Sequence, residues 1–169
     1  NLAAFDEMLV AVNDPTDSII LPEMLTTGFS NNAASLAVEM EITPVEWMLQ
    51  HARNKKALII GSMLIQEGHQ YYNRFIAPFP DGNILTYNKR HLFSLMSEND
   101  YYTPGDQQLV FEFRGWKIFP LICYDLRFPV WCRNTKMADL MVFVANWPEK
   151  RHFHWTTLLK ARAIENQCY

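Results

Sequence analysis

Short apolar runs recur along the chain and predict a series of β-strands. Most runs are bounded by Pro, Gly, Asp or Asn, and several are apolar at consecutive positions, which is typical of strands buried on both faces. They cover residues 18–23, 57–65, 71–77, 84–87, 109–113, 116–123 and 139–146. This pattern predicts a sheet that is covered on both sides.

Three segments with helical periodicity accompany these strands. Apolar residues between 2 and 12 recur at helix spacing, and further helices are predicted over 44–56 and 151–167. Because helices alternate with strands and no linker or repeat interrupts them, we expect residues 1–169 to form one mixed α/β domain.

Two turns connect neighbouring strands. Arg114 and Gly115 separate two β-rich runs by two residues, so we expect a hairpin over 109–123, although Arg-Gly is a weaker turn signal than Asn-Gly. The string "PFPDGN" at 78–83 predicts the second turn.

Composition and charge narrow the class of partner. Charged residues make up 20% of the chain and the net charge is −3, which favours neither a nucleic acid nor an anionic membrane. The apolar runs are far shorter than the roughly 20 residues of a membrane-spanning helix, and the start of the chain has no signal-peptide pattern. We therefore expect a cytoplasmic protein with a small-molecule partner.

The three cysteines are spaced without a C-x-x-C pair, which argues against a disulfide framework and against a zinc cluster. Cys123 stands out because the apolar run that contains it, "PLICYDLRFP", suddenly becomes charged. It is either a buried structural residue or a nucleophile at the end of a strand. A thiol with an ordinary pKa of about 8.5 needs a base or a cation beside it to react at neutral pH.

Two other strand ends carry ionisable groups that could meet this need. Glu23 follows the first predicted strand and Lys89 follows the strand at 84–87. Each alone has a plain interpretation as an exposed charge on a loop. Together with Cys123 they could converge on one rim of the same sheet and supply base, cation and nucleophile to one pocket.

The strings around these residues resemble the nitrilase superfamily of carbon-nitrogen hydrolases. They are "ILPEM" around Glu23, "YNKRHLF" around Lys89, "LICYDLRFP" around Cys123 and "RAIENQ" at 162–167. Their order and separation match the family along almost the whole chain. Within the family, "CYDLRFPVW" and "ANWP" look most like the ω-amidase branch. The resemblance implies an αββα sandwich, here without the family's first strand and its C-terminal part.

The resemblance also implies a catalytic chemistry. Glu23 would be the general base and Cys123 the nucleophile that forms a thioester. The side chain of Lys89 and the backbone N–H of Tyr124 would stabilise the oxyanion, and Lys89 would also favour the thiolate. Glu98 falls where the family has a second glutamate that positions the substrate or the triad, although an exposed loop position is nearly as plausible. Neither a metal nor an organic cofactor is implied.

The ω-amidase branch hydrolyses the terminal amide of 2-oxo dicarboxylic acid monoamides such as 2-oxoglutaramate, so the pocket must hold a carboxylate. Arginine is the best bidentate partner, and Arg127 and Arg151 are candidates by position. An ion pair of Arg127 with Asp125 or Glu165 is the structural alternative.

Asn146 and Trp147 follow a strand directly and are expected to line the same pocket. Their alternative role is an ordinary turn fixed by Pro148. Aliphatic amides, carbamoyl compounds and nitriles stay open as other substrate classes.

Other interpretations compete with this one. A Cys-His hydrolase could use His91, His152 or His154 as its base, but no cysteine-protease signature surrounds Cys123. A metal site on His152 and His154 is weaker, because side chains two positions apart on a helix point in different directions.

A non-enzymatic sandwich that serves protein interaction is the third alternative. Family members begin with a further strand and continue well past residue 167, so we expect the 169-residue chain alone to be an incomplete domain, unstable or inactive by itself. The family also implies a homodimer.

Overall fold

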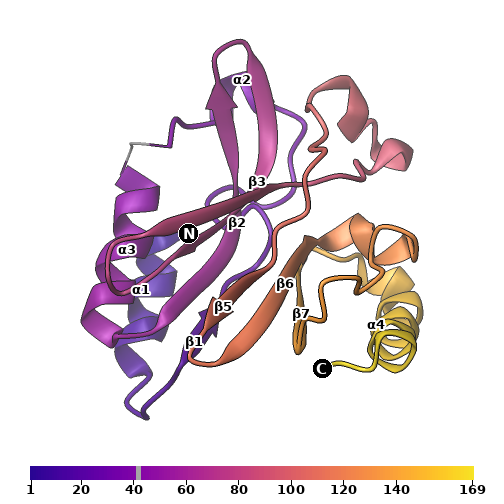
Figure 1. The fold of residues 1–169 in the computed structure, drawn as a ribbon. Coiled ribbons are helices and arrows are strands. Elements are labelled where there is room, and N and C mark those ends of the chain that lie inside the picture. The colour runs from indigo at the N-terminus through magenta and orange to yellow at the C-terminus, as the bar shows by residue number, and fades with distance from the viewer. Residues whose placement is uncertain (41–42) are drawn as a thin grey trace.

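The computed structural model describes residues 1–40 and 43–169, and it contains two β-sheets stacked face to face between helices (Figure 1). The first sheet has the strand order β1-β2-β3-β4. Its strands are β1 (Ser18–Ile20), β2 (Leu58–Glu67), β3 (Gln70–Pro78) and β4 (Ile84–Asn88). β1 runs parallel to β2, and the other neighbours are antiparallel.

The second sheet has the order β5-β6-β7, built from β5 (Phe111–Phe113), β6 (Trp116–Ile122) and β7 (Leu140–Val144). β5 and β6 form the expected hairpin, and β7 lies parallel to β6. Arg114 and Gly115 both have positive φ, at 51° and 81°, as a two-residue type I′ turn requires.

Helices cover the outer faces of the sandwich. Figure 1 shows α1 (Leu2–Ala11) and α3 (Thr43–Lys55) beyond the first sheet, and α4 (His152–Asn166) on the opposite side, beyond β7. α2 (Ala33–Leu36) is a single turn. Among the described residues, four 3₁₀ segments add to the helical structure, at Ser94–Met96, Glu98–Asp100, Cys123–Arg127 and Glu149–Arg151. The layers are therefore α-β-β-α, as the resemblance described above implies.

Strand β2 shows why its sequence is apolar at consecutive positions. Leu58 and Ile60 pack into the core between the two sheets, whereas Ile59 and Met63 pack under the helices with Met48 of α3. Successive side chains of a strand point to opposite faces, so a strand between two apolar layers needs apolar residues on both. The prediction of a sheet covered on both sides is confirmed.

Four predicted strands are shorter in the structure. The strand predicted over 18–23 ends at Ile20, because Pro22 has no N–H to pair and Met24 turns the chain with φ of 47°. The strands predicted over 109–113, 116–123 and 139–146 are reduced to Phe111–Phe113, Trp116–Ile122 and Leu140–Val144. These corrections matter for function, because Glu23, Cys123 and Asn146 all lie just beyond the strands.

Among the described residues, no helix has the length and apolar character needed to cross a membrane.

Candidate active site

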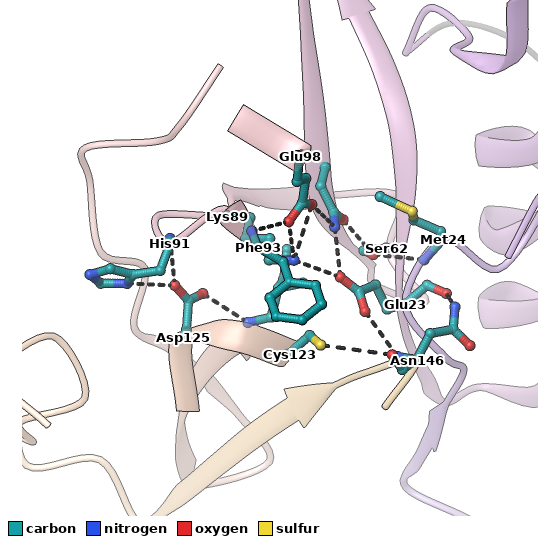
Figure 2. A network of polar contacts seen from close by, with 12 residues as sticks. Glu23, Met24, Ser62, Lys89, His91, Phe93, Glu98, Cys123, Asp125 and Asn146 are labelled. Carbon is teal, nitrogen blue, oxygen red and sulfur yellow. Dashed lines mark hydrogen bonds and ion pairs between the residues drawn. The ribbon is translucent and has the colours of Figure 1, made fainter. Parts of the chain in front are cut away.

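Glu23, Lys89 and Cys123 meet at one end of the sandwich (Figure 2). Glu23 follows β1 and Lys89 follows β4, both in the first sheet, whereas Cys123 follows β6 in the second. The expectation of one rim of a single sheet is therefore wrong: the three residues come from the ends of strands in two facing sheets. Because the two sheets face each other, the Cys123 thiol of the second sheet can lie close to the Glu23 carboxylate and the Lys89 ammonium of the first.

A buried ion-pair network forms the centre of the site. Lys89 Nζ lies 2.9 Å from Glu23 Oε1, and 3.0 and 2.9 Å from Oε1 and Oε2 of Glu98. The exposed fractions of the three residues are 1% for Lys89 and 0% for each glutamate. Burial by itself would lower the pKa of Lys89, but the charges of Glu23 and Glu98 outweigh it and raise that pKa. Lys89 is therefore an ammonium that two carboxylates hold in place.

The two glutamates differ in how many donors they meet. Both oxygens of Glu98 accept from Lys89, Oε2 also accepts the N–H of Phe93, and Oε1 accepts from Asn73 Nδ2 at 3.3 Å. Oε2 of Glu23 accepts a single hydrogen bond within the described part of the chain, from the N–H of Asn146 at 2.9 Å. A carboxylate oxygen can accept about two hydrogen bonds. Glu23 therefore keeps room for a proton, whereas Glu98 is occupied as a counter-ion.

Cys123 occupies a conformation that is unusual for a residue with a side chain. β6 ends at Ile122, Cys123 has φ of 43°, and a 3₁₀ turn follows at once. Non-glycine residues in this region carry strain that is commonly found at functional sites. The side chain is 8% exposed and opens onto a cavity of about 150 Å³ that Lys89 also lines.

The surroundings of Cys123 keep its thiol protonated. Burial raises the pKa of this thiol well above its ordinary value, the charge of Glu23 raises it further, and Lys89 acts in the opposite direction. The expectation that Lys89 favours the thiolate is right in sign, but burial and the carboxylates outweigh it. The thiol can therefore react only as its proton leaves, and the Glu23 carboxylate is near enough to influence it.

Asp125 holds the turn that presents Cys123. It is fully buried, and its Oδ2 accepts hydrogen bonds from the Tyr87 hydroxyl at 2.7 Å and from the N–H of Ile122 at 3.0 Å. Its Oδ1 accepts the N–H of His91 and lies 2.9 Å from His91 Nδ1. At the sequence level, Asp125 was considered only as an ion-pair partner of Arg127. A carboxylate two residues after a cysteine that ends an apolar run is itself a signal of a buried polar contact.

Arg127 does not form either of the ion pairs that the sequence allowed. Asp125 is occupied by the groups above, and Glu165 pairs with Arg162 at 2.8 Å. Arg127 instead lies over the ring of Trp147, with 5.2 Å from Cζ to the ring centroid, and its Nη2 lies 3.0 Å from His154 Nδ1. Its guanidinium is thus placed at the cavity.

The structure gathers the predicted substrate-binding residues around this cavity. Arg151 lies over the ring of Phe93, with 5.5 Å from Cζ to the centroid. The residues predicted for the pocket that line the cavity are Tyr124, Arg127, Asn146, Trp147 and Arg151. Phe29, Phe93, Met96 and Pro148 supply apolar walls. The cavity therefore has largely apolar walls, with three cationic side chains, of Lys89, Arg127 and Arg151, and one thiol.

Sequence reasoning missed Ser62 and Asn73, two buried polar residues behind the carboxylates. Asn73 Nδ2 donates to Glu23 Oε1 at 2.8 Å, and Ser62 Oγ donates to Asn73 Oδ1 at 2.8 Å. Each places a polar residue within a largely apolar strand, in "GSMLI" and "YYNRF". A polar residue at a buried strand position was therefore the sequence signal that could have identified Ser62 and Asn73.

The histidines take other roles. His91 contacts Asp125 and stacks on Phe128, and His154 contacts Arg127, so neither offers its ring to Cys123. Among the described residues, Cys123 Sγ contacts the backbone carbonyl oxygen of Asn146, at 4.0 Å. In the same part of the chain, no group of three or more His, Cys, Asp or Glu side chains is placed to hold a metal ion.

Known proteins resemble this chain both in sequence and in fold. The chain is 48% identical over 169 residues to the omega-amidase YafV of Yersinia enterocolitica, and 40% identical over 158 residues to the 2-oxoglutaramate amidase of Bacillus subtilis. The alignments cover 100% and 90% of this chain but 65% and 61% of those proteins. The chain thus spans less than two thirds of the length of these curated relatives.

A crystal structure gives the same result for the fold. A CN-hydrolase superfamily protein from Xanthomonas campestris, solved with an arsenic adduct in its active site, superposes with a TM-score of 0.95 at 42% identity. The match covers 98% of this chain and 66% of that one. The carbon-nitrogen hydrolase family model matches residues 2–169, so nearly every residue discussed above falls within it. By sequence and by fold, this chain belongs to the carbon-nitrogen hydrolase family, where it resembles the omega-amidases.

Proposed function

We propose that this protein is a cysteine-dependent amidase that hydrolyses the terminal carboxamide of a small 2-oxo acid, such as 2-oxoglutaramate or 2-oxosuccinamate, to the acid and ammonia. The observation that carries the proposal is the buried contact of Lys89 with Glu23 and Glu98 at the edge of the cavity that Cys123 lines. The similarity to proteins named omega-amidase and 2-oxoglutaramate amidase supports the substrate class.

Acylation begins with transfer of the Cys123 proton to Glu23, whose Oε2 has room for it. The sulfur attacks the amide carbon, and the C=O electrons move onto oxygen. Lys89 Nζ and the N–H of Tyr124, in the first turn of the 3₁₀ segment, stabilise this oxyanion. When the oxyanion collapses, the C–N bond breaks, Glu23 returns the proton to nitrogen, and ammonia leaves a thioester on Cys123.

Deacylation uses the same groups. Glu23 accepts a proton from water, and the hydroxyl adds to the thioester carbon. The C–S bond then breaks, and Glu23 returns its proton to the sulfur, which releases the acid and restores the thiol. Glu98 takes no part in these proton transfers and fixes Lys89, which it meets with both oxygens. Its role is to position Lys89 and the triad.

The substrate carboxylate distinguishes an ω-amide of a 2-oxo acid from a simple amide. We place this carboxylate against Arg127 and Arg151, the two guanidinium groups that line the apolar cavity. Asn146 and Trp147 line the path between them and Cys123.

The test is ammonia release by the purified protein from a substrate panel: 2-oxoglutaramate, 2-oxosuccinamate, an aliphatic amide, a carbamoyl amino acid and a nitrile. We expect the 2-oxo acids to give the highest kcat/KM, and separate loss of activity in Cys123→Ala, Lys89→Ala and Glu23→Gln. Highest activity on a neutral amide or a nitrile would contradict the substrate class. Inactivity on every compound, both of residues 1–169 and of a chain extended to the length of the curated relatives, would favour a non-catalytic sandwich for protein interaction.

The two arginines can be tested separately. Arg127→Met or Arg151→Met should raise KM for 2-oxoglutaramate by about tenfold or more, since a charge-assisted contact to carboxylate contributes about 1.5–3 kcal/mol. The same variants should hydrolyse a neutral aliphatic amide no worse than the parent protein does. An equal loss on both substrates would mean that the arginines only support the fold.

We also propose a domain assignment, an oligomeric state and a cellular compartment for this protein. We propose that residues 1–169 belong to one carbon-nitrogen hydrolase domain, because both sheets share one core. We propose a homodimer, supported by Phe153 and Ile164 of α4, which are 76% and 77% exposed, and testable by sedimentation velocity. The free thiols of Cys123, Cys132 and Cys168 fit a reducing compartment such as the cytoplasm.

A further inference from the structure

We infer that Asn73 is a positioning residue for the proposed reaction: its amide group, oriented by Ser62, bridges the two carboxylates and holds the Glu23 carboxylate in place beside Cys123. This inference rests on the proposed function. It concerns residues of β2 and β3 that lie behind the cavity and do not line it.

The orientation of the Asn73 amide follows from the hydrogen bonds around it. The N–H of Met24 donates to Ser62 Oγ at 2.9 Å, and a backbone N–H can only donate. The Ser62 hydroxyl is therefore free to donate its own hydrogen to Asn73 Oδ1, 2.8 Å away. With its oxygen taken in this way, Asn73 must turn its NH₂ group toward the carboxylates.

The NH₂ group then has two acceptors for its two hydrogens. Nδ2 lies 2.8 Å from Glu23 Oε1 and 3.3 Å from Glu98 Oε1. Ser62 and Asn73 are at most 1% exposed, so water does not compete for these bonds. The backbone carbonyl of Asn73 also accepts the N–H of Lys89 at 2.9 Å, so one residue contacts all three members of the buried charge network.

The chain of bonds closes on Glu23 itself. It runs from the N–H of Met24, the residue after Glu23, through Ser62 and Asn73 to the Glu23 carboxylate. Figure 2 shows Ser62 and Met24 beside Glu23, on the side away from His91 and Asp125. Two carboxylates with one ammonium carry a net negative charge, and the N–H dipoles of the Asn73 amide offset part of it. The amide therefore preserves the proton acceptor that the thiol needs.

Asn73→Leu removes both donors with little change in volume. We expect kcat on 2-oxoglutaramate to fall about tenfold or more while KM changes less than about threefold, and the acid limb of the pH profile of kcat/KM to move up by about one pH unit. Ser62→Ala, a smaller change, should move the limb in the same direction but less. A purely structural role would lower activity without moving the limb.

Met63→Ala is the matched control, because Met63 is a neighbour of Ser62 on β2 but packs on the helix side of the sheet. It should destabilise the protein and leave the pH profile unchanged. An unmoved acid limb in both Asn73→Leu and Ser62→Ala would overturn the inference.

If the parent protein hydrolyses no amide, the proposed function fails, and the inference is then judged by the pH dependence of Cys123 alkylation with iodoacetamide. Without the N–H dipoles of Asn73 the negative charge of the carboxylates is offset less and opposes the thiolate more, so Asn73→Leu should alkylate at higher pH than the parent protein. Unchanged alkylation would overturn the inference on this readout.

Discussion

The thiol of Cys123 lies between two opposing electrostatic influences, which can be separated by mutation. Burial and the charge of Glu23 raise its pKa, whereas Lys89 lowers it. The carboxylate that we propose as the acceptor of the thiol proton therefore opposes the thiolate at rest.

Glu23→Gln should shift the pH at which Cys123 alkylates downward, although it abolishes amidase activity, because the charge that opposes the thiolate is gone. Lys89→Met should shift it upward. The measurement is the rate of iodoacetamide labelling of the Cys123 peptide against pH, by mass spectrometry, with the Cys168 peptide as internal control. Shifts of the same sign in both variants would contradict the charge arrangement described here.

Asp125 gives a second test at the residue scale. It accepts hydrogen bonds from Tyr87, Ile122 and His91, and Asp125→Asn would replace an acceptor by a donor facing other donors. We expect a loss of about 2–3 kcal/mol of unfolding free energy, and about 1 kcal/mol for Tyr87→Phe, which removes one bond. Urea unfolding measures both, and equal small losses would show that Asp125 does not hold the turn.

At the scale of elements, the end of β4 depends on the loop that follows the second 3₁₀ segment. The N–H of Gly105 donates to the carbonyl of Lys89 at 2.9 Å, and a Cβ at position 105 would overlap the backbone carbonyl of Asn88. The loop can approach the strand end this closely only as glycine. The position of Lys89 therefore depends on a residue without a side chain.

Gly105→Ala should lower both stability, by about 1–3 kcal/mol, and kcat, because the overlap displaces the strand end that carries Lys89. Gly68→Ala is the control: its φ of 60° is strained for alanine, but open space surrounds it. It should cost stability alone. If Gly105→Ala loses stability but keeps its kcat, this loop does not determine the position of Lys89 in the site.

The elements also show what the sequence could and could not predict. Runs such as 57–65 and 71–77 predicted β2 and β3 well, because a buried strand needs apolar residues on both faces. The ends of β1, β6 and β7 were placed too late, since apolar residues or cysteine continue past the last paired residues, Ile20, Ile122 and Val144.

The candidate site was predicted through its strand ends, and its long-range partners were not. Glu23, Lys89 and Cys123 are marked by a charge or thiol at the end of an apolar run. The pairing of two sheets, the donors of Asn73 and the contacts of Asp125 join residues far apart in sequence, and no local pattern specifies which acceptor each one meets. For the same reason, the ion pairs considered for Arg127 were wrong.

At the scale of the whole molecule, the core between the sheets contains a second thiol that links stability to pH. Burial, followed by the charge of Asp125, raises the pKa of Cys132 from 9.0 to about 12. The folded state therefore favours the protonated thiol. This contribution to stability is complete below about pH 9 and is lost as the pH rises toward about 12.

Between about pH 8 and pH 10, the parent protein should lose about 1 kcal/mol of unfolding free energy through Cys132 alone. Over the same interval, the unfolding free energy of Cys132→Ala should fall by about 1 kcal/mol less than that of the parent protein. Cys168→Ala, which changes a more exposed thiol, should have nearly the same pH dependence as the parent protein. Urea unfolding at the two pH values measures the difference. An identical pH dependence in Cys132→Ala and the parent would contradict the assignment.

The central claim is that Cys123 attacks the amide carbon and carries the acyl group. The most direct measurement is mass spectrometry of the protein quenched in acid during turnover of 2-oxoglutaramate. We predict a mass increase of one 2-oxoglutaryl group on the peptide that contains Cys123, lost on treatment with hydroxylamine and absent in Cys123→Ala. Rapid ammonia release with no acyl group on that peptide, or undiminished release by Cys123→Ala, would contradict the account.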